Sequence, residues 1–132
     1  MNVFRWFWAK LWKKSRNIGI EGEILACRFI KKQGYSIIAR NWRFGRGEID
    51  IVARDNNVLV FIEVRLRSKG ASVRGYESIL KRKKIVLRQT CFAYLKRCVK
   101  EVPTYRFDVI DIEHDYGGNV DVVHHYENVP FF

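Results

Sequence analysis

The chain has 132 residues, a formal net charge of +11, and hydrophobic residues at 48% of its positions. These values fit one globular domain, and they exclude a disordered chain and a membrane span of about 18 uninterrupted apolar residues. The three cysteines are an odd number, which argues against a disulfide framework and predicts a protein of a reducing compartment, the cytoplasm.

The chain begins with a basic and aromatic segment that has the spacing of an amphipathic helix. Its apolar residues recur at Phe4, Phe7, Trp8 and Leu11. We therefore predict a helix within residues 1–17 and a single domain over residues 18–132. Docking of residues 3–14 on this domain or on a second copy is favoured, and binding to a membrane surface is the alternative.

The rest of the chain alternates between helical and strand patterns. The pattern predicts a helix over residues 20–33, strands over 35–43, 48–54 and 58–66, a loop over 69–75, a long basic helix over 76–98, and strands over 106–113 and 120–126 that are joined by a turn at 117–119. Because no internal repeat or low-complexity linker interrupts this order, we expect one α/β domain.

The positive charge is concentrated in one part of the chain. Residues 65–100 contain twelve Lys or Arg and one acid, which gives +11, whereas residues 101–132 contain one Arg and seven acids, which gives −6. Such clustering is typical of a protein that binds a polyanion. A solvated basic helix without a partner is the alternative.

The strands at 48–54 and 58–66 form a predicted hairpin around Asn56 and Asn57, residues that tolerate the left-handed conformation of tight turns. With a two-residue loop, facing residues have numbers that sum to 113. Asp50 then faces Glu63 across the hairpin, and Glu48 faces Arg65.

Two facing carboxylates within apolar strands repel each other, so this arrangement needs a compensating positive charge. A divalent cation would supply it, since Mg²⁺ favours carboxylate oxygens. A proton shared by the two acids, or an ion pair of Arg65 with one acid, would also supply it. Glu23, beside the apolar stripe of the helix at 20–33, is either a third carboxylate of a metal site or a first-turn acid that the helix dipole stabilises.

Asp50, followed after twelve residues by Glu63-Val64-Arg65, resembles the D…(D/E)-x-K core of PD-(D/E)XK nucleases. More narrowly, residues 19–112 resemble the YraN family of bacterial proteins, which are similar to Holliday-junction resolvases. The motifs that carry this resemblance are Gly22-Glu23, Gly34-Tyr35, Asn41-Trp42-Arg43, Gly47-Glu48-Ile49-Asp50, Phe61-Ile62-Glu63-Val64-Arg65-Leu66-Arg67, Lys83, Tyr94-Leu95 and Arg106-Phe107-Asp108-Val109.

The resemblance implies an α/β fold with a mixed central sheet flanked by helices and a restriction-endonuclease-like core. It also implies that Asp50 and Glu63 bind Mg²⁺ or Mn²⁺, that Glu23 completes the site, and that Lys83 reaches toward the site or the nucleic-acid backbone. Because resolvase-like proteins commonly pair, a homodimer is compatible with the resemblance.

Arg65 departs from the nuclease pattern, which has lysine at this position. An arginine stays protonated and cannot act as a general base, but it can stabilise the charge that develops around phosphorus. The expected catalytic residues are therefore Asp50, Glu63, Arg65 and Glu23. A metal-dependent nuclease-like protein is the leading hypothesis, and a non-catalytic nucleic-acid-binding module with the same fold is the alternative.

The basic residues around the long helix are expected to contact DNA rather than RNA. They are Arg67, Lys69, Arg74, Lys81, Lys83, Lys84 and Arg88. Phosphate contacts of this kind give affinity without reading bases. Since no sequence-reading motif is present, we expect binding that selects nucleic-acid structure rather than sequence.

Overall fold

The computed structural model describes residues 18–68, 81–115 and 119–132. The predicted helix within residues 1–17, the loop at 69–75 with Lys69 and Arg74, and the start of the basic helix at 76–80 lie outside these ranges. Most of the predicted turn at 117–119 also lies outside them.

The predicted order of helices and strands is confirmed in the described ranges. The elements are α2 (Ile18–Lys32), β1 (Ser36–Phe44), β2 (Gly47–Asp55), β3 (Val58–Ser68), α3 (Lys81–Cys98), β4 (Thr104–His114) and β5 (Val120–Tyr126). Gly34 ends α2 as predicted, because it adopts a φ of 94° and its N–H donates to the Lys31 carbonyl.

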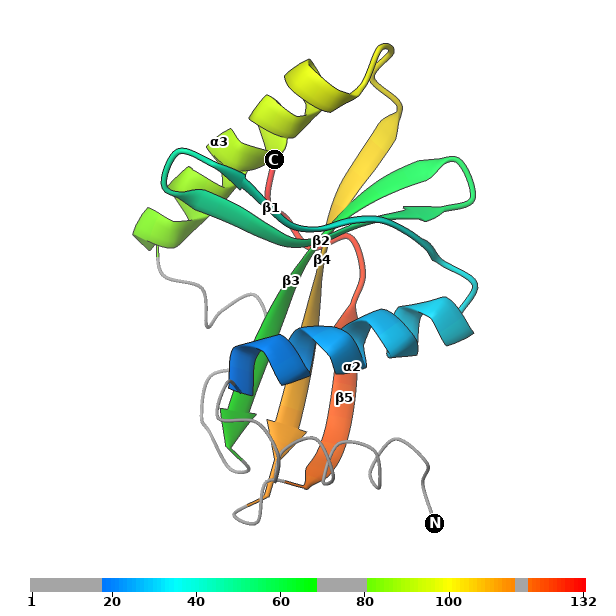
Figure 1. Ribbon diagram of the computed structural model, residues 1–132, viewed down its shortest axis with the longest axis vertical. Coiled ribbons are helices and arrows are strands. Elements are labelled where there is room, and N and C mark those ends of the chain that lie inside the picture. Colours follow the sequence, from blue (N-terminus) through cyan, green and yellow to red (C-terminus); the bar gives the residue numbers. More distant parts are fainter. Residues whose placement is uncertain (1–17, 69–80, 116–118) are drawn as a thin grey trace.

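The five strands form one sheet in the order β1-β2-β3-β4-β5. The sheet is mixed, since β3 and β4 are parallel and the other neighbouring pairs are antiparallel. α3 makes the crossover between the parallel strands, while α2 lies across β3, β4 and β5 (Figure 1). The structure thus confirms the predicted α/β class and the mixed sheet.

The helices α2 and α3 cover opposite faces of the sheet. On one face, Leu25 and Ile30 of α2 pack with Ile51 and Ile62. On the other face, Leu87 and Cys91 of α3 belong to the same core cluster as Val52 and Phe61. This division follows from the alternation of side chains along β2 and β3. All three cysteines are free thiols, in agreement with the odd count.

The β2–β3 hairpin has the predicted register from Asp55↔Val58 to Ile51↔Ile62, and Asn56 adopts the left-handed φ of 52°. The pairing of the two strands ends at Ile51↔Ile62, one residue before the pair that the prediction placed at Asp50 and Glu63. Asp50 therefore lies where β2 separates from β3.

A sharp twist of β2 accompanies this separation. Ile49 belongs to the core cluster under α3, whereas Ile51 belongs to the cluster under α2, although the two residues would share a face in a regular strand. The residue opposite the twist is Asn41 of β1, which has a φ of 53° between the pairs Arg40↔Ile51 and Trp42↔Ile49. The twist brings Asp50 to the junction between the two faces of the sheet, where residues of both helices can approach it.

In the ranges that the structure describes, neither helix is long and apolar enough to span a bilayer.

Candidate metal centre

Asp50 and Glu63 line the same pocket, although the strand pairing that placed them opposite each other ends at Ile51↔Ile62. Because the ladder has ended, the Val64 N–H donates to Asp50 Oδ2 at 2.8 Å, while the Glu63 side chain is only 2% exposed. Burial, and then the neighbouring Glu63 carboxylate, raise the pKa of Asp50 to about 8. A buried carboxyl beside a second carboxylate therefore holds its proton near neutral pH unless a cation enters.

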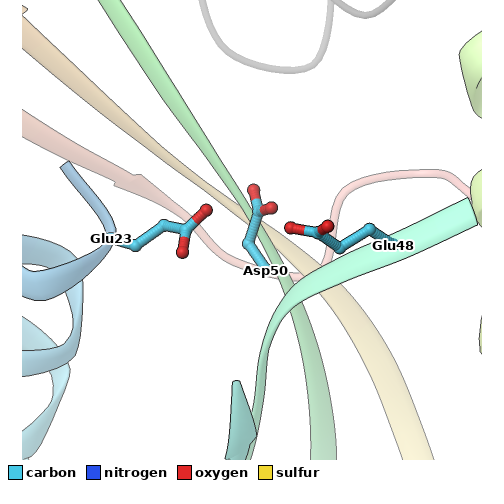
Figure 2. A group of neighbouring side chains, drawn as sticks. All are labelled: Glu23, Glu48 and Asp50. Carbon is cyan, nitrogen blue, oxygen red and sulfur yellow. The ribbon is translucent and has the colours of Figure 1, made fainter. Parts of the chain in front are cut away.

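Glu23 and Glu48 join this pair from two further positions. Carboxylate oxygens of Glu23, Glu48 and Asp50 lie within 4.8 Å of one another. Figure 2 shows the Asp50 carboxylate between that of Glu23, which projects from α2, and that of Glu48, which projects from β2. Glu23 thus lies where the hypothesis of a third carboxylate requires it.

Glu48 was not among the candidate metal ligands, because sequence reasoning placed it opposite Arg65. In the described ranges its ion pair is instead with Arg43 of β1, at 2.7 Å between Nε and Oε2. The twist at Asp50 turns Glu48 away from β3, which explains why the predicted pairing with Arg65 fails. The sequence feature that could have identified Glu48 as a candidate ligand is its spacing from Asp50, because residues two apart on a regular strand share a face.

Among the described residues, two cations approach Glu63. Lys83 Nζ of α3 contacts Glu63 Oε1, and Arg65 Nη1 lies 3.8 Å from the same oxygen. The ion pair of Arg65 with one acid, which was one of the alternatives to a metal ion for compensating the charge of the carboxylate pair, is thus present. Its distance of 3.8 Å is long for an ion pair. The contact with Lys83 is the shorter of the two.

The donor set fits a hard divalent cation. It consists of carboxylate oxygens, the ligands that Mg²⁺ and Mn²⁺ prefer. Glu23 Oε2 is buried and has no hydrogen-bond partner among the described residues. Burial raises the pKa of Glu23 despite the hydrogen bond from Asn41, and the charges of Glu48 and Glu63 raise it further. A bound cation would satisfy this oxygen and reduce the repulsion among the acids.

The pocket lined by Glu48, Asp50 and Glu63 has a volume of about 240 Å³. Its lining residues are Arg46, Gly47, Glu48, Asp50, Glu63, Lys83, Val86 and Leu87. Gly47 lets β2 approach α3 closely, because a Cβ at this position would lie 1.7 Å from Thr90 Oγ1. The close contact holds the middle of α3 against β2.

Two residues that were predicted to bind nucleic acid have other partners. The Arg67 side chain is only 9% exposed and forms ion pairs of 2.9 Å with Asp111 and Glu113 of β4. Arg88 Nε donates to the Phe131 carbonyl at 2.9 Å. Both side chains thus connect parts of the fold, and their contact with DNA stays a prediction. Lys81 and Lys83 are exposed on α3, and Lys84 is half-buried there.

The motif at 106–109 builds a separate polar network. Asp108 is fully buried and accepts hydrogen bonds from Arg106, from His125 and from the Asn128 N–H. Burial alone would raise the pKa of Asp108, but these hydrogen bonds together lower it. The network joins β4, β5 and the segment after β5, so it stabilises the sheet and adds no ligand to the acidic cluster.

These features define an α/β protein with a mixed sheet. Its strands β2 and β3 and its helix α2 bring four carboxylates together at the point where β2 separates from β3. The chain belongs to the family described as "Uncharacterised protein family UPF0102", whose model matches residues 22–112. The match spans the positions of Glu23, Glu48, Asp50, Glu63 and Lys83. It confirms the family that the sequence motifs indicate.

Relatives of similar length support this membership. A UPF0102 protein of Symbiobacterium thermophilum is 42% identical over 106 residues, which cover 80% of this chain and 90% of the relative. One from Pelotomaculum thermopropionicum is 41% identical over 111 residues, covering 84% and 92% respectively. One from Chlorobaculum parvum is 41% identical over 104 residues, covering 79% and 78%.

Proposed function

We propose that this protein is a metal-dependent nuclease-like protein of the PD-(D/E)XK superfamily with a restriction-endonuclease-like core. In this proposal it binds DNA and hydrolyses phosphodiester bonds, and it selects DNA structure rather than sequence. The observation that carries the proposal is the cluster of Glu23, Glu48 and Asp50 within 4.8 Å, next to the buried Glu63.

The electrostatic cost of this cluster supports a functional role. Four carboxylates lie together, and Asp50 holds its proton up to about pH 8 when no metal is bound. The neighbouring cations offset this charge only in part. Arg43 is 75% exposed, so its ion pair with Glu48 contributes about 0–1 kcal/mol. Strongly perturbed carboxyl groups in a pocket are typical of catalytic and metal-binding sites.

The position of each residue suggests its role in the proposed function. Asp50, Glu63 and Glu23 would hold Mg²⁺ or Mn²⁺, and Glu48 lies close enough to take part. A bound ion would supply Lewis-acid charge at the phosphate and lower the pKa of a water. Arg65 adds a permanent positive charge on β3, and the exposed Lys81 on α3 would contact the DNA backbone.

The location and assembly are also proposals. Three free thiols are compatible with the reducing cytoplasm. A homodimer would suit a branched substrate, which presents two equivalent strands. The proposed substrate is DNA. We propose that the segment at residues 3–14 docks on the protein's own domain or on a second copy, with binding to a membrane surface as the alternative.

A cleavage assay on linear, flapped and four-way DNA of matched sequence tests the function. With Mg²⁺ or Mn²⁺ we expect the branched substrates to be cut faster than the linear duplex, independently of the sequence at the branch. Binding should weaken steeply as the salt concentration rises, because phosphate contacts release counterions. Salt-insensitive binding, or cleavage that does not need a divalent metal, would contradict the proposal.

The second candidate function is a non-catalytic nucleic-acid-binding module with the same fold. Arg65 favours it, since a guanidinium stands near Glu63 where the nuclease pattern has lysine. This candidate predicts that the wild-type protein binds branched DNA without cutting it and that Arg65→Lys gains cleavage. A wild-type protein that cuts, with no gain in Arg65→Lys, would exclude it.

A further inference from the structure

We propose that Lys83 of α3, rather than Arg65 of β3, is the cation that contacts and positions the reacting phosphate over the acidic residues. This inference rests on the proposed function and names the residue that supplies the role of the nuclease lysine. The two candidates approach the same oxygen, Glu63 Oε1, so their geometries can be compared directly.

Contact and exposure favour Lys83. Its Nζ contacts Glu63 Oε1, while nearly half of its side chain, 47%, is exposed. Arg65 Nη1 is 3.8 Å from that oxygen, and its side chain is 29% exposed. Lys83 also lines the pocket that contains Glu48, Asp50 and Glu63, whereas Arg65 is not among the lining residues. A ligand that enters this pocket would meet the lysine.

The fold holds Lys83 in this position. Lys83 and Leu87 are four residues apart on α3 and therefore share one side of the helix. Leu87 is 2% exposed and anchors that side in the core. The close approach of Gly47 to Thr90, one turn further along α3, sets the distance between the helix and β2. The packing of α3 thus directs Lys83 to the acids of the sheet.

The chemistry of an ammonium group suits the role. It has three N–H donors on a flexible stem, so it can keep one hydrogen bond to Glu63 and donate others to a phosphate oxygen or a water. In the hydrolysis, the water oxygen bonds to phosphorus and releases a proton to solvent, while the bond from phosphorus to one sugar oxygen breaks and that oxygen takes a proton from solvent. The products are a phosphomonoester and a sugar hydroxyl. Lys83 stabilises the charge on the phosphate oxygens in this step and transfers no proton.

Lys83→Gln in the full chain tests this inference, with Arg65→Gln as the competing variant. Arg82→Gln is the matched control, because it removes one positive charge from the same turn of α3 at a residue that does not line the pocket. Single-turnover cleavage of four-way DNA in Mg²⁺ should fall by about 100-fold in Lys83→Gln, the usual cost of losing one donor to a developing oxyanion. It should fall much less in Arg65→Gln and Arg82→Gln, and Lys83→Arg should recover part of the rate.

A second readout separates positioning from support of the fold. Mn²⁺ affinity without DNA should rise several-fold in Lys83→Gln, because a positive charge beside Glu63 is removed. A fall in Mn²⁺ affinity and thermal stability together with cleavage would overturn the inference, since Lys83 would then only hold Glu63 in place. Full cleavage by Lys83→Gln would overturn it as well.

The failure of the proposed function has a different signature. A wild-type protein without Asp50-dependent cleavage would contradict the function itself, and this inference with it. A wild-type protein that cuts, combined with a Lys83→Gln variant that cuts equally fast, would contradict only the role of Lys83.

Discussion

Asp50→Asn is expected to reduce Mg²⁺-dependent cleavage of branched DNA by about 1000-fold or more. Asp50 occupies the centre of the acidic cluster, where its carboxylate lies between those of Glu23 and Glu48 (Figure 2). The Glu63 carboxylate is a further neighbour of Asp50. An amide of the same shape has no charge to offer a cation. Losing the several kcal/mol that a metal ion contributes to the transition state corresponds to a rate loss of this size.

The matched control for this variant is Asp55→Asn, an identical change near the other end of β2. Asp55 pairs with Arg106 at 3.2 Å and does not line the pocket. We expect Asp55→Asn to keep its cleavage activity under conditions in which it remains folded, which circular dichroism would verify. Equal cleavage by Asp50→Asn and the wild-type protein would show that the metal is held elsewhere.

The metal-free protein is expected to lose stability as the pH rises from about 4 to about 8, the interval between the ordinary value of 3.8 and the pKa of Asp50 in the fold. Within this interval the folded protein holds a proton that the unfolded chain has released. The free energy of unfolding therefore decreases with rising pH. The raised pKa of Glu23 acts in the same direction.

Asp50→Asn should flatten this dependence and raise the melting temperature of the metal-free protein by several degrees at pH 8, because the repulsion with Glu63 is removed. Mn²⁺ should restore the stability of the wild-type protein at pH 8 and have little effect on the variant. Thermal melts in chelator and in Mn²⁺ between pH 5 and pH 8, at one-unit steps, measure both effects. Parallel curves for the two proteins would contradict the proposed charge distribution.

The hairpin shows how far local sequence determines the site. The turn residues Asn56 and Asn57 fixed the register of β2 and β3, and the structure confirms that register as far as Ile51↔Ile62. The prediction continued the same pairing to Glu48 and Arg65, which requires a regular strand. The twist at Asp50 ends that regularity. Its sequence signal was Asn41, a residue that tolerates the left-handed φ it adopts in the middle of β1.

The basic residues show what charge counting leaves undecided. The charge of residues 65–100 predicted binding to a polyanion, but Arg67 forms ion pairs with Asp111 and Glu113, and Arg88 donates to the Phe131 carbonyl. These partners lie more than 40 positions away in the chain. Their contacts depend on the parallel pairing of β3 with β4 and on the path of the C-terminal segment, which composition does not reveal.

The central claim is that the carboxylates at the separation of β2 and β3 bind a divalent cation. Anomalous scattering from crystals soaked in Mn²⁺ tests it most directly. We predict a peak in contact with the Asp50 carboxylate and with at least one of Glu23, Glu48 and Glu63, and no such peak in Asp50→Asn crystals. A wild-type site without a peak at millimolar Mn²⁺, with Lys83 still in contact with Glu63, would contradict the claim.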